Sequence, residues 1–378
     1  MCGKLFVTIA KGLIYMRLYG DGVHDDFPAI QEMLDSGVCE VRLPAPEKNY
    51  FISDTLRIHS FQKLILPRYA VIRMADNSNR PMIRNDDYEN GNRSFSVEGG
   101  IWDYNNLGQA KNPYVIPQPD LPGYEGLLTL FKNVQDCRFS NMTFKDPITF
   151  CLVLDTARYF TVENIVFDFN YGNPTPENMD GVHLYGNCHY GVIRNCQGTC
   201  YDDLVAINAD EGSCGPISHI EVDGIFAENC HSAVRLLSCK QPVENIHIHN
   251  VHGTYYQYCI GITKHFEGEA TWYDALVFEN IHASKAIRHS FYQKDDQPEY
   301  PLICFEYDLH IKSAVIRDVY RIEENSGVPL IFVAKTTTID RLRIENVRQE
   351  DRSGKKPKVF ACDGKVGTLV TDETVTDA

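Results

Sequence analysis

Residues 134–144 read VQDCRFSNMTF and residues 157–167 read ARYFTVENIVF, and this pair of segments decides the fold. In each segment, apolar residues alternate with polar ones up to an asparagine, Asn141 or Asn164, and more apolar residues follow it. Strict alternation over about five residues predicts β-strands. An asparagine at a repeated turn can bond the turn backbone and stack on the asparagine of the next copy. We therefore expect strands with an asparagine corner.

The same pattern returns along the rest of the chain. Its polar markers are Asn141, Asn164, Asn195, Asp223, Asn250, Asn280, Asp318 and Asn346, with successive spacings of 23, 31, 28, 27, 30, 38 and 28 residues. Shorter apolar strands separate the copies, at residues 150–155, 182–185, 204–208, 233–237 and 260–263. A loose period in this range is typical of solenoids, in which extra residues are placed in loops. The sequence predicts an all-β fold, a right-handed parallel β-helix.

The chain of 378 residues is expected to form a single domain, residues 1–378, because a solenoid grows by adding coils that contact only their neighbours. One helix is predicted from Asp26 to Leu34, with Asp25 or Asp26 as its cap and Ile30 and Leu34 on one side. This short capping helix, within an N-terminal cap of about residues 20–40, would cover the open strand edges at the end of the solenoid. Residues 108–123, rich in Pro and Asn, are expected to form a long loop.

Composition excludes several classes of partner. The formal net charge of −15 disfavours nucleic acid and anionic membrane surfaces. Thirteen cysteines without a CxxC pair argue against zinc and against a disulfide framework. The stretch from Leu5 to Tyr19 is interrupted by Lys11 and Arg17, so we interpret it as neither signal peptide nor membrane span. A reducing, cytoplasmic location is the expectation.

Three aspartates are the candidate catalytic residues. Asp180 opens one short strand and the pair Asp202-Asp203 opens the next, 22 residues later, which is roughly one coil. Coils lie about 4.8 Å apart, so these carboxylates are expected to converge. Crowding would leave one carboxyl protonated while another stays ionised, as an acid and a base for glycoside hydrolysis require. A single loop aspartate is more often a turn residue, but a stacked set of three is harder to explain that way.

Further polar residues flank these acids. Asn178 and His183 lie beside Asp180, and His231 lies at the entry of a strand one coil beyond Asp202-Asp203. Alternation of Val234 and Leu236 turns Arg235 outward, where it could pair with the acids or grip a substrate. In the next coil Thr263 and His265 are expected outward, and Lys264 only if the strand ends there. His247, His249 and His252 lie on another sheet with no evident carboxylate partner, which disfavours a metal cluster.

These motifs resemble glycoside hydrolase family 28, the polygalacturonase-like hydrolases of the pectin lyase-like β-helix superfamily. The likeness covers most of the chain. Residues 20–26 (GDGVHDD) look like the family's entry segment, and Asn178-Met179-Asp180-Gly181 looks like its Asn-Thr-Asp motif with Met for Thr. Asp202-Asp203, followed by an apolar strand, is similar to its Asp-Asp motif and is the most specific match.

The resemblance implies roles for these residues. Asp202 would be the general acid, and Asp180 and Asp203 would hold the attacking water, with inversion at the anomeric carbon and no metal or organic cofactor. The family's Gly-His-Gly motif is present only as Cys230-His231-Ser232, and its Arg-Ile-Lys motif is not intact. Lys264 would stand for its lysine, whereas Arg235 falls one coil early for its arginine. Those motifs bind a uronate carboxylate in galacturonan-cleaving members.

Three functions remain open from the sequence. The first is an inverting hydrolase acting on a pectin-like or related oligo- or polysaccharide. The second is a polysaccharide lyase or epimerase on the same solenoid, which needs Arg or Lys as the base and often calcium. The third is a non-catalytic glycan-binding or tailspike-like β-helix.

Overall fold

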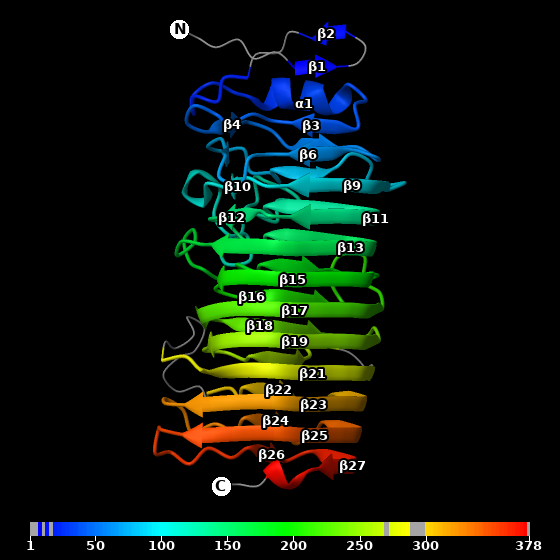
Figure 1. Cartoon of the computed structure of the whole chain (residues 1–378), viewed down its shortest axis with the longest axis vertical. Helices are drawn as coiled ribbons and strands as arrows, with labels where there is room; N and C mark the ends of the chain where they lie inside the picture. Colours follow the sequence, from blue (N-terminus) through cyan, green and yellow to red (C-terminus); the bar gives the residue numbers. More distant parts are fainter. Residues whose placement is uncertain (1–6, 10–11, 15–17, 268–271, 288–298, 376–378) are drawn as a thin grey trace.

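The computed structural model describes residues 7–9, 12–14, 18–267, 272–287 and 299–375. It confirms the parallel β-helix: all strands except a small hairpin join one continuous sheet whose paired strands run parallel (Figure 1). Each coil contacts the coil before and the coil after it, and the stack runs from blue to red along the long axis of the molecule (Figure 1).

The strands fall into three groups. The hairpin is β1 (Val7–Ile9) and β2 (Gly12–Ile14). The short-strand sheet contains β5 (Leu56–Ile58), β8 (Ile83–Asn85), β14 (Val182–Leu184), β16 (Asp203–Asn208), β18 (Ser232–Leu237), β20 (Ile260–Thr263), β22 (Ile303–Phe305), β24 (Ile331–Val333) and β26 (Phe360–Cys362). The first residues of two long strands, β11 and β13, complete this sheet between β8 and β14.

Long strands build the other two faces. They are β11 (Thr129–Ser140), β13 (Leu152–Asp168), β15 (His189–Thr199), β17 (Ile217–Cys230), β19 (Val243–Tyr255), β21 (Trp272–Lys285), β23 (His310–Glu323), β25 (Thr338–Asp351) and β27 (Lys365–Thr371). Near the N-terminal end the same faces are made by β3 (Glu40–Arg42), β4 (Tyr50–Ile52), β6 (Lys63–Ile65), β7 (Val71–Met74), β9 (Asn92–Glu98), β10 (Ile101–Asp103) and β12 (Thr143–Lys145). Two short 3₁₀ helices, η1 (Asn106–Gly108) and η2 (Glu373–Val375), lie outside the sheet.

The asparagine corner predicted from the repeat is present. Asn141, Asn164 and Asn195 have φ of 57°, 55° and 53°, the left-handed region that asparagine tolerates better than other side chains. Their side chains form a ladder, since Asn164 Nδ2 donates to Asn141 Oδ1 at 3.1 Å and Asn195 Nδ2 donates to Asn164 Oδ1 at 3.2 Å. The ladder explains how one short pattern bends every coil at the same place.

The predicted corner residue Asp223 lies one residue before the observed corner. The strand register pairs Arg194 with Asp223, so the corner opposite Asn195 is Gly224, whose φ is 80°. Glycine takes the left-handed conformation without a side chain, and Asp223 keeps the ladder going by accepting a hydrogen bond from Asn250 Nδ2 at 2.6 Å. The sequence pattern therefore assigned this corner to Asp223 instead of Gly224.

The apolar residues that alternate along the strands fill the interior of the solenoid, which holds one long core cluster. Helix α1 (Phe27–Asp35) lies across its N-terminal end (Figure 1) and buries Ile30, Met33 and Leu34, which confirms the predicted capping helix. Asp26 is its N-cap residue, but the Asp26 carboxylate accepts from the backbone N–H groups of Tyr19 and Gly20 rather than from the helix.

Among the described residues, no helix is long and apolar enough to cross a membrane. Lys11 and Arg17, which interrupt the apolar N-terminal stretch, lie outside the described residues. The twelve described cysteines are free thiols, most of them buried. In the core, a buried reduced cysteine packs as a small apolar side chain.

Candidate active site

All three predicted acids line one cavity of about 290 Å³ on the outer surface of the short-strand sheet. Asp180 lies just before β14, Asp202 just before β16, and Asp203 begins β16. The cavity is lined by Phe150, Asn178, Asp180, His183, Asp202, Asp203, Asn208, Glu211, His231, Arg235, Leu237, Gln257 and His265. Acids from two successive coils therefore face a common space, as their spacing predicted.

The register refines which acid faces which. Val182 pairs with Val205, so two residues earlier Asp180 stands opposite Asp203, a separation of 23 residues rather than 22. Backbone hydrogen bonds agree, because Gly181 N donates to Asp203 O at 3.0 Å. Asp202 comes one residue earlier and turns more to solvent, with 14% of its side chain exposed against 4% for Asp203. Its Oδ2 accepts from the backbone N–H of Asn178 at 3.2 Å, which ties the two coils together.

His183 links Asp180 to a fourth acid. Its Nδ1 lies 2.6 Å from Asp180 Oδ2 and its Nε2 lies 2.9 Å from Glu211 Oε2, so both ring nitrogens meet a carboxylate. The ring is buried and stacks on Phe150 with centroids 4.0 Å apart. Glu211 was not among the predicted site residues. It comes from the turn after β16, where only its position directly behind an apolar strand of the site could have drawn attention to it.

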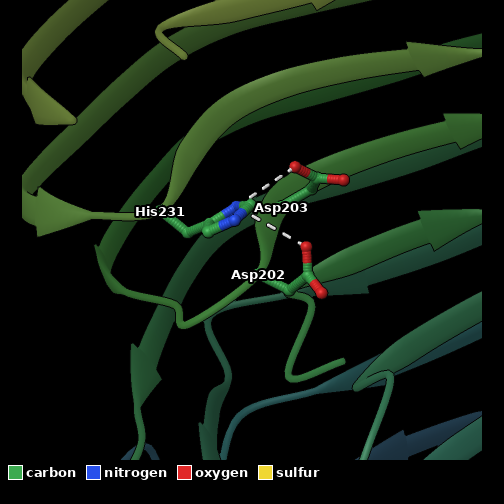
Figure 2. A group of neighbouring side chains, drawn as sticks. All are labelled: Asp202, Asp203 and His231. Carbon is green, nitrogen blue, oxygen red and sulfur yellow. Dashed lines mark ion pairs between the residues drawn. The ribbon is translucent and has the colours of Figure 1, made fainter. Parts of the chain in front are cut away.

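His231 bridges the aspartate pair. Figure 2 shows its imidazole pointing between the two carboxylates, with Nδ1 at 3.5 Å from Asp202 Oδ1 and 3.6 Å from Asp203 Oδ1. Ser232 Oγ lies 3.0 Å from the same nitrogen. The eroded motif Cys230-His231-Ser232 thus places its histidine beside the acids, and its serine supplies a second polar contact to that ring.

Arg235 reaches the acids from the next coil. Its Nη1 lies 3.7 Å from Asp203 Oδ2, and its Nε donates to Thr263 Oγ1 at 3.0 Å. The register pairs Ala206 with both His183 and Arg235, so a methyl group stands between the imidazole and the guanidinium. Gly261 follows on the other side of Arg235, again without a side chain to crowd it. Because Ala206 and Gly261 are small, His183 and Arg235 have space around them on the outer surface of the sheet.

The pKa values of Asp180 and Asp203 are shifted in opposite directions. Burial, and next the negative charge of Asp202, raise the pKa of Asp180 well above its usual value. Burial acts the same way on Asp203, but Arg235 and His231 outweigh it, and the pKa of Asp203 is lowered. Despite its burial, His183 has its pKa raised to about 10 by Asp180 and Glu211. Near neutral pH the Asp180–His183 contact therefore retains a proton, and Asp203 is ionised.

Two buried carboxylate oxygens in this cluster have no hydrogen-bond partner among the described residues. They are Asp180 Oδ1 and Asp203 Oδ1. A buried oxygen without a donor is costly, and a water or a substrate hydroxyl in the cavity would satisfy it. The two acceptors belong to aspartates on adjacent coils.

An aromatic wall borders the cavity on its N-terminal side, where Phe150 lines it. Leu127, Phe150, Val153 and Tyr185 form a small apolar cluster of their own on the outer surface of the sheet, and Tyr114 stacks on Phe150 with centroids 5.9 Å apart. Tyr114 belongs to the predicted long loop. Asn112 anchors that loop to the insert before β14, since its backbone N–H donates to Asn173 O at 3.0 Å and its Nδ2 donates to Glu177 O at 2.7 Å.

Some of the remaining predicted residues line the cavity and others do not. Asn178 and His265 line the cavity. Lys264 follows directly after β20 and is not among the lining residues; its Nζ lies 3.9 Å from Asp308 Oδ2. Thr263, expected outward, pairs in register with the cavity-lining Leu237 and accepts from Arg235 Nε, but it is fully buried. Besides Glu211, the lining residues that sequence reasoning missed are Phe150, Asn208, Leu237 and Gln257.

Two histidines of the trio on the other sheet have acidic neighbours. His247 Nε2 lies 3.2 Å from Glu279 Oε2, and His249 Nε2 lies 3.0 Å from Glu221 Oε1. Both carboxylates come from adjacent coils, which is why the local sequence did not reveal them. These are side-chain pairs across partly exposed rungs of the sheet, so carboxylate partners that were not evident in the sequence are present for His247 and His249.

Comparisons with known proteins agree on the architecture. No family model matches the sequence, and no curated protein matches it by sequence. The structure is similar to a hyperthermoactive exopolygalacturonase from Thermotoga maritima (TM-score 0.59, 13% identity, 93% of this chain and 89% of that one). It is also similar to the endo-xylogalacturonan hydrolase from Aspergillus tubingensis (TM-score 0.57, 16% identity, 94% and 95%).

A protein of another kind has the same fold. The N-terminal fragment of bacteriophage Phi29 gene product 12 matches with a TM-score of 0.54 and 13% identity over 95% of this chain and 71% of that one. At such identities these likenesses establish a shared parallel β-helix, and the chemistry has to be argued from the site itself.

Proposed function

We propose that this chain is a glycoside hydrolase that cleaves a glycosidic bond in a pectin-like or related oligosaccharide with inversion at the anomeric carbon. The observation that carries the proposal is the convergence of Asp180, Asp202 and Asp203 from two successive coils on one solvent-connected cavity. Glycoside hydrolysis needs a carboxylic acid on one side of the bond and a carboxylate that activates water on the other.

Asp202 is assigned as the general acid. It is the most exposed of the three acids, and the Asn178 backbone and His231 hold its two oxygens in place. A proton donor has to reach the leaving-group oxygen of a substrate that lies over the sheet, and the buried Asp180 and Asp203 are less able to do so. The resemblance of Asp202-Asp203 to the family 28 Asp-Asp motif supports the same assignment.

Asp180 and Asp203 are assigned to hold the attacking water. Each has one buried oxygen that lacks a hydrogen-bond partner among the described residues, and the two stand opposite each other in register. Arg235 and His231 keep Asp203 ionised, so it can accept a proton from the water. His231, Arg235 and His265 line the same cavity and would contact the sugar, with Asn178 at its edge.

The substrate class rests on two supports. Arg235 and His183 place cationic groups over the cavity floor, which suits a sugar that carries a carboxylate. Two of the structural neighbours described above are named as an exopolygalacturonase and an endo-xylogalacturonan hydrolase. The proposal includes an intracellular, cytoplasmic site of action on oligosaccharides, in keeping with the many free thiols of the chain.

The test is the release of reducing ends from a panel of pectic oligosaccharides, with the anomeric configuration of the first product followed by NMR. Asp202→Asn should reduce turnover at least a thousandfold, which corresponds to about 4 kcal/mol of transition-state stabilisation. Asp168→Asn, an exposed aspartate on a different face, serves as the control and should leave the rate unchanged. Unsaturated products that absorb ultraviolet light, or wild-type rates in Asp202→Asn, would refute the hydrolase.

A further inference from the structure

A second cavity, of about 610 Å³, opens on the same short-strand sheet near its N-terminal end. Its walls come from β5, β8, the start of β11 and the segment 120–127, and the proposed hydrolysis uses none of them. Its lining residues include Arg57, Arg84, Tyr88, Tyr124, Leu127 and Leu130.

The aromatic wall separates this arginine cavity from the acid cavity. Leu127 and Leu130 line the arginine cavity, and Phe150 of the same apolar cluster lines the acid cavity. From Arg84 the register runs through Leu130 and Val153 to His183, which is three coils. At about 4.8 Å per coil the two sites lie roughly 14 Å apart along the axis.

Two arginines face this cavity in register. Arg57 of β5 pairs directly with Arg84 of β8, on neighbouring parallel strands. Like charges side by side on a sheet repel each other, so the pairing is unfavourable unless something neutralises it. Within the described part of the chain neither guanidinium has an ion pair with a carboxylate, although the nearby Arg80 is paired with Asp54 at 2.8 Å. Burial raises the pKa of Asp54, but Arg80 and, more weakly, the nearby Arg57 lower it below its usual value. Neither Arg57 nor Arg84 is in direct contact with an acid among the described residues, so both guanidinium groups can bind an anionic ligand.

Aromatic rings complete the cavity. The guanidinium of Arg84 lies over the ring of Tyr88, 4.4 Å from its centroid. Tyr104 is fully buried and its hydroxyl interacts with that of Tyr124, which donates to Ala110 O at 2.9 Å. Tyrosine faces beside paired arginines suit a ring with both an apolar face and a carboxylate.

From these observations we infer that the arginine cavity is a second binding site, for a carboxylated sugar unit of a glycan chain. Arg57 and Arg84 hold the carboxylate, and Tyr88 and Tyr124 pack against the ring. The glycan class rests on the proposed function, but the anion site rests on Arg57 and Arg84 alone. Because the wall separates the two cavities, this site anchors a chain without taking part in bond cleavage.

The experiment measures binding by calorimetry with the full chain carrying Asp202→Asn, so that turnover does not consume the ligand. The probes are trigalacturonate, the neutral galactose trisaccharide and inorganic phosphate. Arg57→Gln and Arg84→Gln should each weaken trigalacturonate binding at least tenfold, and the neutral trisaccharide should bind equally weakly to all variants. Arg93→Gln is the matched control, because Arg93 is an exposed arginine that stacks on Phe61 at 5.2 Å, away from the cavity.

The outcomes separate this inference from the proposed hydrolysis. Unchanged trigalacturonate affinity in Arg57→Gln and Arg84→Gln, with unaltered thermal unfolding, would overturn the second site whether or not the enzyme hydrolyses pectic sugars. Phosphate that displaces trigalacturonate with comparable affinity would overturn the sugar class. Arginine-dependent binding that persists in a chain without hydrolytic activity would support the anion site and count only against the hydrolase.

Discussion

The imidazole of His183 meets the carboxylate of Asp180 at 2.6 Å, three residues away along the chain, and its other nitrogen meets Glu211. A histidine held by two carboxylates keeps its proton far above its ordinary range, and its pKa is raised to about 10. The positive charge that results sits at the base of a cavity otherwise rich in acids. Glu211 thereby acts on the site through His183.

Replacing Glu211 by glutamine keeps the shape of that contact and removes its charge. We expect the pKa of His183 to fall in Glu211→Gln, and turnover of a confirmed substrate to fall about tenfold, a loss of about 1.4 kcal/mol in transition-state stabilisation. The histidine titration can be followed by NMR in protein labelled at histidine. Glu228→Gln, an exposed glutamate on another face, is the control, and an unmoved His183 titration in Glu211→Gln would contradict the assignment.

Stability against pH should reveal His183 together with Lys285. His183 has a raised pKa, so its contribution is complete below about 6.5 and is lost as the pH rises through about 10. Lys285 is buried, and burial lowers its pKa from 10.5 to about 7, so the folded state gains stability between those values, where the unfolded chain still holds a proton that the folded chain has released. Between pH 7 and 10 the two slopes oppose each other.

We therefore expect the stability of the wild type to change little between pH 7 and 10. Stability should fall more steeply towards pH 10 in Lys285→Met, which keeps only the His183 contribution. It should rise towards pH 10 in Glu211→Gln, in which the Lys285 contribution dominates. Urea unfolding midpoints from pH 6.5 to 10 measure all three. Identical slopes in the three proteins would show that neither group is linked to folding in this range. Lys285 also donates to the backbone carbonyl of Tyr256 at 3.1 Å, so the midpoints are compared as slopes and not as absolute values.

The asparagine ladder should be measurable at Asn164. Its side chain bonds both Asn141 and Asn195, and its backbone is left-handed. Asn164→Ala loses both hydrogen bonds and strains the corner, so the free energy of unfolding should fall by about 2 kcal/mol. Asn164→Gly loses the bonds without the strain and should cost about 1 kcal/mol. Equal losses in the two variants would mean that the corner conformation contributes nothing.

The aromatic wall predicts where a substrate is cut. Phe150 lines the acid cavity and Tyr114 stacks on it, so we expect the wall to leave less room for sugar units on the N-terminal side, and products to be released near a chain end. Tyr114→Ala shortens the wall and should increase the share of internal cleavage, which chromatography of early products detects. A wild-type enzyme that yields long internal fragments from the start would contradict this role.

Local pattern was sufficient for the fold and for most of the site. Alternation and the asparagine corner depend on neighbours in sequence, so Asn141, Asn164 and the Asp202-Asp203 pair could be interpreted directly. The role of Glu211 could not, because its contact with His183 joins residues 28 apart through a turn without periodicity. Gly224 was missed for a simpler reason: a glycine corner leaves no side chain in the ladder, so the neighbouring Asp223 was taken for the marker.

Ala206 carries a single methyl group between His183 and Arg235. A larger residue there would have to fit between the imidazole and the guanidinium. A change to valine or leucine at position 206 would therefore push these two cationic groups apart without altering any of the acids.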